Sequence, residues 1–363
     1  MAATHSPVEP SEIRTRLDTY FEALLAAYEE ATRRSPAHSY TRALAERRLV
    51  VRTVGKALQE VFTPSLTHLP TLSTCLPGGL EVLAWDEAAT GVPLPAPPWP
   101  PPPEGTATSA PRLTLPAGGE DYRIQLAEQE AFFIMYSLNK RQAVIWTREA
   151  ASLPTYVHSA PFPALIRWWS QQNALLMLHA GCVGIGSGAA LLVGKSGSGK
   201  STTALHCALS GFHYLSDDLC LVRTQPHPHA YCLFNSGKLL PHTLSQFPQL
   251  TSLAVDPQPG SEGKPVIFMH QHFPDKVAGE MPLKAVIAPR VAGTPETRSS
   301  VISPAEALRA LAPSTLLPRS HPEHASFHDM ARLVRHLPCY RLELGTRMEE
   351  IPAVIRQLIE SSD

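Results

Sequence analysis

The chain has 363 residues, of which 44% are hydrophobic, and its formal net charge at pH 7 is −1. This length and composition are typical of a globular protein with one large or two ordinary domains, and they exclude an intrinsically disordered chain. The near-zero net charge argues against a basic field for nucleic acid or for an anionic membrane.

The N-terminal part of the chain combines one helical pattern with several strand patterns. Residues 11–33 place apolar side chains at helical spacing with charges between them, which predicts an amphipathic helix whose apolar face packs against another part of the protein. Apolar runs at 49–54, at 80–85 and within 122–147 predict strands. We therefore expect a small α+β module over residues 1–150.

A proline-rich segment, residues 92–111, interrupts this module. Proline has no N–H to donate to a sheet, so the segment cannot lie inside one. It is either a polyproline ligand for an aromatic groove of a partner or a semi-rigid surface loop, and its composition favours the loop.

Cysteine usage and the N-terminal residues indicate the compartment. The six cysteines are spread widely without a Cys-x-x-Cys pair, which is typical of reduced thiols in a cytoplasmic protein. The N-terminus lacks the basic start and apolar run of a signal peptide. Residues 174–194 are free of Asp, Glu, Lys and Arg, but their glycines favour two buried strands joined by a turn over a membrane span. We expect a soluble protein that does not bind a membrane.

Residues 151–363 are predicted to form a second, α/β domain. A helix over 161–178 leads into it, and a capping box at Ser303–Glu306, with proline at the first helical position, starts another. Residues 351–360 predict a closing helix. Strands are expected at the apolar runs 190–193, 212–216, 230–235, 265–270, 283–288 and 340–344.

A phosphate-binding motif begins this domain. The run Gly194-Lys195-Ser196-Gly197-Ser198-Gly199-Lys200-Ser201, followed by Thr202, fits G-x-x-x-x-G-K-[ST] in full, between a predicted strand and a predicted helix. The glycines let backbone N–H groups point at phosphate oxygens, and the helix N-terminus adds positive potential. Lys200 would neutralise the β- and γ-phosphates of ATP, and the Ser201 hydroxyl would bind Mg²⁺.

Two adjacent carboxylates, Asp217 and Asp218, follow Lys200 after a helix, a turn and a short strand. A helix, a turn and a strand in this order bring the two aspartates back to the sheet edge at which the phosphate-binding loop lies. One carboxylate can hold Mg²⁺ and the other can take the proton of an attacking hydroxyl, as phosphoryl transfer to an alcohol requires. A solvated turn or a helix N-cap is the alternative.

From His179 to Leu219 the sequence resembles the core of HPr kinase/phosphorylase and its relatives, on the pattern His179, G-x-S-G-x-G-K-S-x-x-A-L, then G-F-H-x-L-x-D-D. The resemblance implies a phosphoenolpyruvate-carboxykinase-like nucleotide domain. By position it implies that Lys200 and Ser201 bind phosphate and metal, and that Asp217 is the general base. It further implies that Asp218 is a metal ligand, that His179 packs against the catalytic acid, and that the protein is a homo-oligomer.

The downstream HPr-kinase signature, a glutamate and an R-G-x-G-I run, is absent, and residues 234–250 stand in its place. The resemblance therefore implies a relative with another acceptor, such as the serine kinases that modify ribosomal peptides. Lys238 and Lys264, each beside a glycine, could reach a phosphate or an acidic acceptor, but such lysines are more often solvated loop residues.

The leading hypothesis is an ATP- and Mg²⁺-dependent kinase that phosphorylates a serine hydroxyl on a protein or peptide. Two alternatives stay open. One is a nucleotide-gated binding protein with little or no turnover, and the other is a kinase of a small molecule such as free serine. An ABC-type ATPase is disfavoured because no L-S-G-G-Q run follows.

Overall fold

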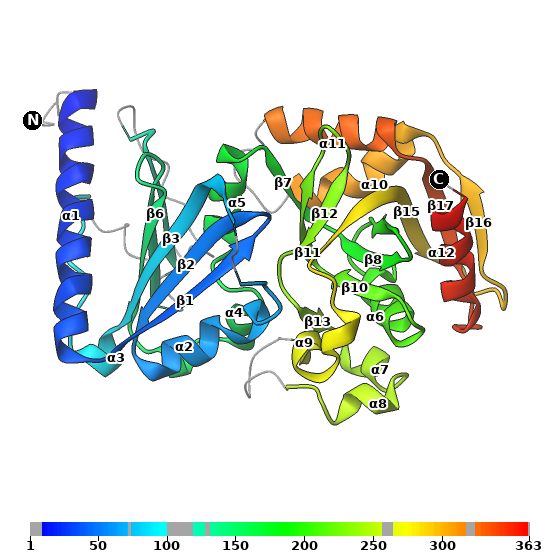
Figure 1. The fold of residues 1–363 in the computed structure, drawn as a ribbon, viewed down its shortest axis with the longest axis horizontal. Helices are drawn as coiled ribbons and strands as arrows, with labels where there is room; N and C mark the ends of the chain where they lie inside the picture. Colours follow the sequence, from blue (N-terminus) through cyan, green and yellow to red (C-terminus); the bar gives the residue numbers. More distant parts are fainter. Residues whose placement is uncertain are drawn as a thin grey trace, which may run out of the picture. The chain divides into compact units, whose positions relative to one another are not determined.

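The computed structural model describes residues 9–71, 74–99, 119–127, 131–255, 264–316 and 324–361. The chain divides into two compact units (Figure 1). Unit 1 comprises Met1–Phe62, Thr71–Leu153 and Phe162–Gln172, and unit 2 comprises Thr63–Pro70, Pro154–Pro161 and Asn173–Asp363. Each unit combines helices with a mixed sheet, so the fold is of mixed α/β class.

Among the described residues of unit 1, six strands form a mixed sheet in the order β1-β2-β3-β6-β5-β4. The strands are β1 (Ala37–Leu44), β2 (Arg47–Val54), β3 (Leu76–Asp86), β4 (Tyr122–Ala127), β5 (Phe132–Ser137) and β6 (Gln142–Thr147). The helical elements are α1 (Pro10–Arg34), α2 (Lys56–Phe62), α3 (Glu87–Thr90), η2 (Ala150–Ser152) and α5 (Pro163–Gln172). The strands expected at 49–54, at 80–85 and within 122–147 are confirmed.

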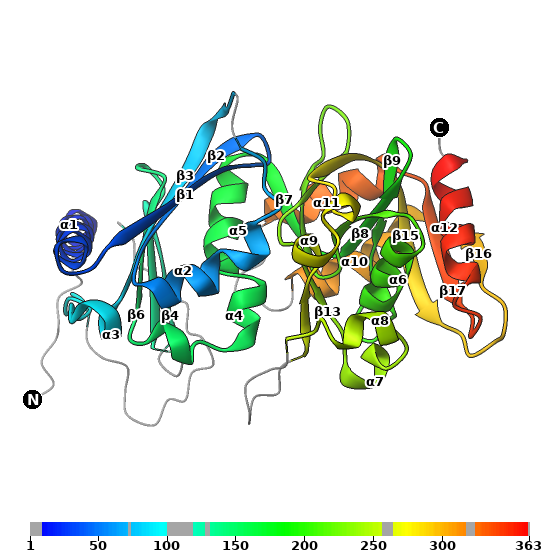
Figure 2. The ribbon, with the colours of Figure 1, turned by 60° about the horizontal axis from the view of Figure 1, so that its bottom comes forward.

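Helix α1 confirms the amphipathic helix predicted over 11–33. Its apolar side chains Leu17, Phe21 and Leu24 are buried in one cluster with Trp85 of β3 and Val144 of β6. Burial of such side chains stabilises a fold by about 1.5–3 kcal/mol each, so the helix is held by its apolar face. Figure 2 shows α1 end-on beside the sheet.

The first part of the proline-rich segment, residues 92–99, packs on α1. Tyr20 donates its phenol to the carbonyl of Pro95 at 3.0 Å, and the rings of Tyr20 and Trp99 meet edge to face at 5.3 Å. This part is therefore anchored to unit 1 by hydrogen bonding and ring packing. Residues 100–111 of the segment lie outside the described residues.

Unit 2 is built on a larger mixed sheet. Its path runs β10-β8-β9-β15-β12-β11-β7, and β17 pairs with β15 and with β16. The strands are β7 (Leu175–His179), β8 (Gly181–Ile185), β9 (Gly188–Leu192), β10 (His213–Ser216), β11 (Leu219–Arg223), β12 (His229–Cys232), β15 (Glu280–Val291), β16 (Arg298–Val301) and β17 (Cys339–Leu344). A separate two-stranded antiparallel sheet contains β13 (Ser236–Lys238) and β14 (Val266–Phe268). The long strand β15 is central because it pairs in parallel with both β9 and β17.

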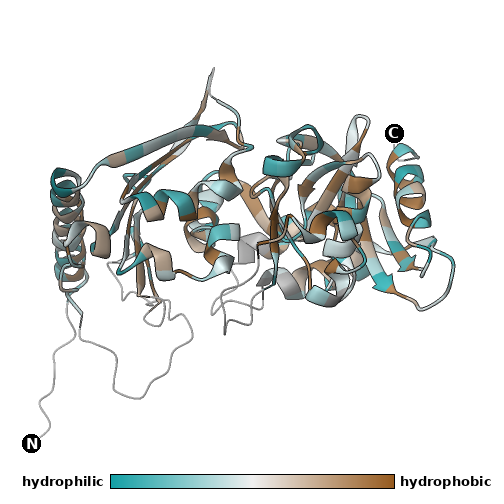
Figure 3. Cartoon of the chain, turned by 90° about the horizontal axis from the view of Figure 1, so that it is seen from below, coloured by the Kyte–Doolittle hydropathy of each residue, from teal (hydrophilic) through white to brown (hydrophobic). Residues whose placement is uncertain are grey.

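Helices cover both faces of this sheet. The longer ones are α6 (Lys200–Leu209), α10 (Pro304–Leu316), α11 (His324–His336) and α12 (Glu350–Glu360). Leu191 of β9 packs in a cluster with α10 and α11, whereas its neighbour Leu192 packs with α6 and α12. This alternation follows from the two-residue period of a strand. Helix α12 carries both hydrophilic and hydrophobic residues, as Figure 3 shows beside the label C, and it buries Ile351 and Ile355.

Shorter helical elements of unit 2 are η1 (Pro64–Leu66), α4 (Thr155–Ser159), α7 (Pro241–Leu244), α8 (Pro248–Thr251), α9 (Met269–His272) and η3 (Pro274–Lys276).

The predicted capping box is confirmed, because Ser303 N–H donates to Glu306 Oε2 at 3.1 Å and Glu306 N–H donates to Ser303 Oγ at 3.3 Å. The closing helix is confirmed as α12. In the described part of the chain, no helix is both long enough and apolar enough to cross a bilayer.

Three secondary-structure predictions are wrong. The helix expected over 161–178 ends at Gln172, and β7 follows as a strand paired with β11. A short apolar run fits a buried helix and a buried strand equally well, and the left-handed Ala174, with φ 53°, breaks the helix here. The strand expected over 265–270 ends at Phe268, and a helical turn, α9, takes the last two positions. Residues 174–194 hold β7, β8 and β9 instead of two strands.

Two short segments from the N-terminal half, those carrying η1 and α4, belong to unit 2, so the division differs from a single boundary at 150. Asn235 N–H donates to the carbonyl of Ser65 at 2.9 Å. Ser236 Oγ donates to the carbonyl of Ser159 at 2.6 Å. These bonds fix the start of β13. Helix α5, expected in the second domain, lies in unit 1.

A fragment that begins at residue 151 is therefore expected to be defective. It lacks the η1 segment and leaves Asn235, which is fully buried, without the carbonyl acceptors of Ser65 and Pro64. Unsatisfied buried donors cost about 1–3 kcal/mol each, so β13 should open locally. Hydrogen exchange should show loss of protection at the β13 amides relative to the full chain. Equal protection in the fragment and the full chain would contradict the prediction.

His68, in the same segment, is expected to make the stability of unit 2 depend on pH. Its Nε2 lies 3.2 Å from the carbonyl of Cys232, and its Nδ1 lies 3.3 Å from Asn235 Nδ2, so the neutral ring satisfies both contacts. Burial lowers the pKa of His68 to about 4. In the unfolded chain, His68 takes up a proton near its ordinary pKa of about 6.5. The neutral, buried ring should therefore make its full contribution to the unfolding free energy above about pH 7. This contribution should then fall between about pH 6.5 and 4, by up to about 3 kcal/mol.

The matched variant for this prediction is His68→Gln, which cannot titrate. Urea unfolding at pH 7 and at pH 4.5 should show a larger loss of unfolding free energy in the wild type than in the variant. Equal losses in the two proteins would show that His68 titrates at its ordinary pKa in the folded chain.

Candidate functional site

The glycine-rich motif, residues 194–201, connects β9 to α6 in unit 2 and includes the first two residues of that helix. Val193 N–H donates to the carbonyl of Ile287 at 2.8 Å, which fixes the start of the loop on β15. Gly199 has φ 99°, and a Cβ added there would lie 2.4 Å from Leu344 Cδ1. Glycine suits that position because other residues are strained at this positive φ, and a side chain there would also have to displace the end of Leu344. The strand, the loop and the helix follow the order that the motif requires.

Lys200 begins α6 and is buried, at 6% exposure. Its ammonium donates to two carbonyls of its own loop, those of Gly194 at 2.6 Å and Lys195 at 3.1 Å. Burial lowers the pKa of Lys200, and the Asp218 carboxylate opposes that shift. Ser201 Oγ lies 3.5 Å from the main-chain oxygen of Asp217, so the start of α6 and the end of β10 are adjacent.

Asp217 follows β10 and is almost fully buried, at 1% exposure. Its Oδ1 accepts the phenol of Tyr214 at 3.1 Å, and its Oδ2 accepts the main-chain N–H of Lys238 at 2.8 Å. Burial, followed by the neighbouring Asp218 carboxylate, raises the pKa of Asp217 to about 6. The side chain is therefore fixed in direction and holds a proton more readily than an exposed aspartate.

Asp218 is more accessible, with 31% of its side chain exposed, and two basic groups contact it. Its Oδ1 lies 2.9 Å from His179 Nε2, and its Oδ2 lies 2.7 Å from Lys238 Nζ. Although burial opposes the shift, Lys238 and His179 hold the pKa of Asp218 well below its usual range. The surroundings thus raise the pKa of Asp217 and lower that of Asp218. Such a pair provides one carboxylate that can accept a proton and one that stays ionised.

His179 ends β7, opposite Leu219 in the register with β11. Its main-chain N–H donates to Thr315 Oγ1 at 3.2 Å. The resemblance places this histidine against the catalytic carboxyl residue, for which Asp217 was predicted, whereas in the structure His179 Nε2 lies 2.9 Å from Asp218 Oδ1. The difference follows from the strand pairing, because Leu219 is opposite His179 and Asp218 immediately precedes it.

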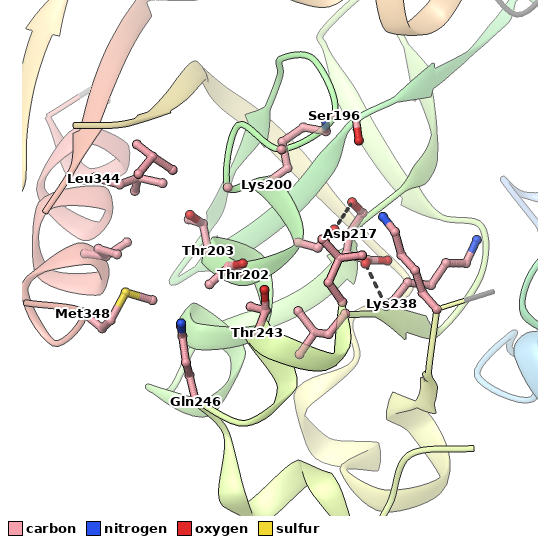
Figure 4. A pocket seen from close by; sticks show the side chains of 18 of the residues that line it. Ser196, Lys200, Thr202, Thr203, Asp217, Lys238, Thr243, Gln246, Leu344 and Met348 are labelled. Atoms are coloured by element: carbon pink, nitrogen blue, oxygen red, sulfur yellow. Dashed lines mark hydrogen bonds between the residues drawn. The ribbon is translucent and has the colours of Figure 1, made fainter. Parts of the chain in front are cut away.

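One pocket of about 790 Å³ contains these groups, within the range of about 300–1,000 Å³ that small-molecule sites occupy. Figure 4 shows Leu344 and Met348 on one side of Lys200, with Asp217 and Lys238 on the other. The predicted site residues that line the pocket are His179, Ser196, Gly197, Gly199, Lys200, Ser201, Thr202, Asp217 and Asp218. Gly194, Lys195 and Ser198 belong to the same loop but are not among the lining residues.

Thr203 and Lys238 are two of the lining residues that the sequence did not assign to the site. Thr203 is fully buried, and its Oγ1 has no hydrogen-bond partner among the described residues; its only signal was its place after the motif. Lys238 was interpreted as a solvated loop lysine, but only 17% of its side chain is exposed and it contacts both carboxylates. Lys264, the second such lysine, is exposed and lines the same pocket.

No family model matches the chain, and no curated protein matches it. Among solved structures, the chain is similar to the Hpr(Ser) kinase/phosphatase from Coxiella burnetii, with 13% identity and a TM-score of 0.26. The similarity covers 51% of this chain and 94% of that chain. The functional proposal for this chain therefore depends on its own residues.

Proposed function

We propose that this chain is an ATP- and Mg²⁺-dependent phosphotransferase that phosphorylates a hydroxyl group, with a serine of a protein or peptide as the acceptor. The observation that carries the proposal is the shared pocket: Lys200 and Ser201 of the glycine-rich loop line it together with Asp217 and Asp218. A loop that fits the phosphate motif and two carboxylates with opposite pKa shifts are the parts that hydroxyl phosphorylation needs.

The residues present fit Mg²⁺. Ser201 offers a hydroxyl and Asp218 a carboxylate, both hard oxygen donors on the wall of one pocket. No cluster of three or more His, Cys, Asp or Glu residues that could hold a metal occurs in the described part of the chain. The hydroxyl of Ser201 and the carboxylate of Asp218 suit Mg²⁺, which takes few protein ligands and completes its shell with water and substrate phosphates. Bound there, Mg²⁺ would neutralise phosphate charge.

In this proposal the main-chain N–H groups of the loop and the Lys200 ammonium bind the triphosphate of ATP. The hydroxyl oxygen of the acceptor bonds to the γ-phosphorus while the bond from that phosphorus to the β,γ-bridging oxygen breaks. Asp217 takes the hydroxyl proton, and ADP leaves with the bridging oxygen. Tyr214 and the Lys238 main chain, which bond one oxygen of Asp217 each, leave it lone pairs for that proton.

The proposal is tested by incubating the protein with Mg²⁺ and γ-labelled ATP. The acceptors, each supplied in its own reaction, are serine-containing peptides, free serine and water. We expect label on a peptide serine and slow release of labelled phosphate without acceptor, both dependent on Lys200. Label on free serine alone would place the protein among small-molecule kinases. Tight MgATP binding with neither labelling nor release would favour the nucleotide-gated binding protein and overturn the proposal.

A further inference from the structure

Lys238 ends β13, on the wall of the pocket that also holds the two carboxylates. A single residue contacts both of them, because its main-chain N–H donates to Asp217 Oδ2 and its ammonium lies 2.7 Å from Asp218 Oδ2. Its side chain is mostly buried, so this cation is held in the pocket and is not a mobile surface charge. The Lys238 ammonium is therefore a fixed positive charge beside both carboxylates.

The backbone that presents Lys238 is fixed from several directions. The Tyr214 hydroxyl, which shares its one proton between Asp217 Oδ1 and the carbonyl of Ser236, lies 2.7 Å from that carbonyl oxygen. A Cβ added at Gly237 would lie 3.0 Å from Leu205 Cδ2, so β13 packs closely on α6. Lys238 itself is paired with Val266 in the two-stranded sheet of β13 and β14. A cation on so rigid a support keeps its position, which is what stabilisation of a transition state requires.

Two of the pocket's three lysines, Lys200 and Lys238, come from different parts of the fold. Lys200 stands at the loop, where its ammonium bonds to loop carbonyls. Lys238 comes from a strand that follows the carboxylates in the chain. Asp218 has a second contact besides Lys238, since His179 Nε2 lies 2.9 Å from its Oδ1.

We infer that Lys238 is a catalytic residue whose ammonium binds the oxygens of the γ-phosphoryl group during its transfer. The inference rests on the proposed phosphotransferase function and adds a residue to it. Charge on the transferring group is spread over three equatorial oxygens, and a cation supplied from outside the phosphate loop stabilises that charge. Lys238 keeps its protons throughout, while the acceptor proton goes to Asp217.

The test compares two complexes of the full chain, MgADP alone and MgADP with aluminium fluoride, which mimics the transferring phosphoryl group. In Lys238→Met the MgADP affinity should stay within about 3-fold of wild type. The affinity for the aluminium fluoride complex should fall by about 100-fold, since transition-state groups are bound more tightly than ground-state groups. Lys238→Arg should recover part of this loss, because a cation is restored.

The matched control is Lys276→Met, which removes a partly buried lysine of unit 2 that bonds the carbonyl of Ala208 outside the pocket. It should bind both complexes as the wild type does. If Lys238→Met does not fold, Lys238→Gln, which retains a polar group, should show the same selective loss. A variant that binds aluminium fluoride as tightly as wild type, or that loses MgADP affinity equally, would overturn the inference alone. A wild type that binds MgADP but never the aluminium fluoride complex would overturn the phosphotransferase itself.

Discussion

Replacing Asp217 by asparagine is expected to lower the rate of phosphoryl transfer by about 10³-fold while MgATP affinity stays within about 3-fold of wild type. A positioned general base contributes about 10²–10⁴ to a rate, and asparagine cannot accept the proton. The amide has nearly the same size as the carboxylate, so the buried site should persist. Single-turnover transfer to a labelled peptide, together with nucleotide titration, measures both quantities.

Asp275→Asn provides the control, because Asp275 is an exposed aspartate of unit 2 outside the pocket. It should transfer phosphate at the wild-type rate. Asp218→Asn should also slow transfer but should in addition raise the Mg²⁺ concentration needed for half-maximal rate, since Asp218 is the proposed metal ligand. If Asp217→Asn retained full transfer while Asp218→Asn alone lost it, the proton-accepting role would belong to the second carboxylate.

Replacing Lys200 by methionine is expected to weaken MgATP binding by about 100-fold, equivalent to roughly 3 kcal/mol. The rate at saturating MgATP should fall by about 100-fold more, because the cation also stabilises charge on the transferring group. The side chain is buried and similar in length to methionine, so folding should be preserved. Titration with a fluorescent ATP analogue and a transfer assay at high MgATP separate the two losses.

Lys195→Met makes the same chemical change five residues earlier in the same loop. Lys195 is exposed, and in the proposal it serves ATP through its main-chain N–H. Its replacement should alter MgATP affinity by less than about 3-fold, as a surface charge contributes little. Equal losses in the two variants would mean that the loop does not direct Lys200 at the phosphates.

The local parts of the fold could be predicted from the sequence. Helix α1 is defined by its apolar spacing, and α10 by the capping box at Ser303 and Glu306, because both signals lie within one helix. The prediction failed where an apolar run was short. The run 175–179 fits a buried helix as well as a strand, and its pairing with β11, more than forty residues later, decided the matter.

The candidate site was predictable in its contiguous part only. The loop and the two aspartates fit a spacing that can be read along the chain, and the structure places them on one pocket. Lys238 could not be assigned in this way, because its contacts with the carboxylates depend on how β13 packs on α6. The contact between Asn235 and Ser65 spans 170 positions and carries no local signal, which is why a single boundary at residue 150 missed it.

A crystal structure of the full chain with Mg²⁺ and a non-hydrolysable ATP analogue tests the central claim most directly. We predict that the γ-phosphate will lie between the Lys200 ammonium and the carboxylates of Asp217 and Asp218, with the ion bound to Ser201 Oγ. An analogue bound with its γ-phosphate directed away from both aspartates, or bound outside this pocket, would contradict the account.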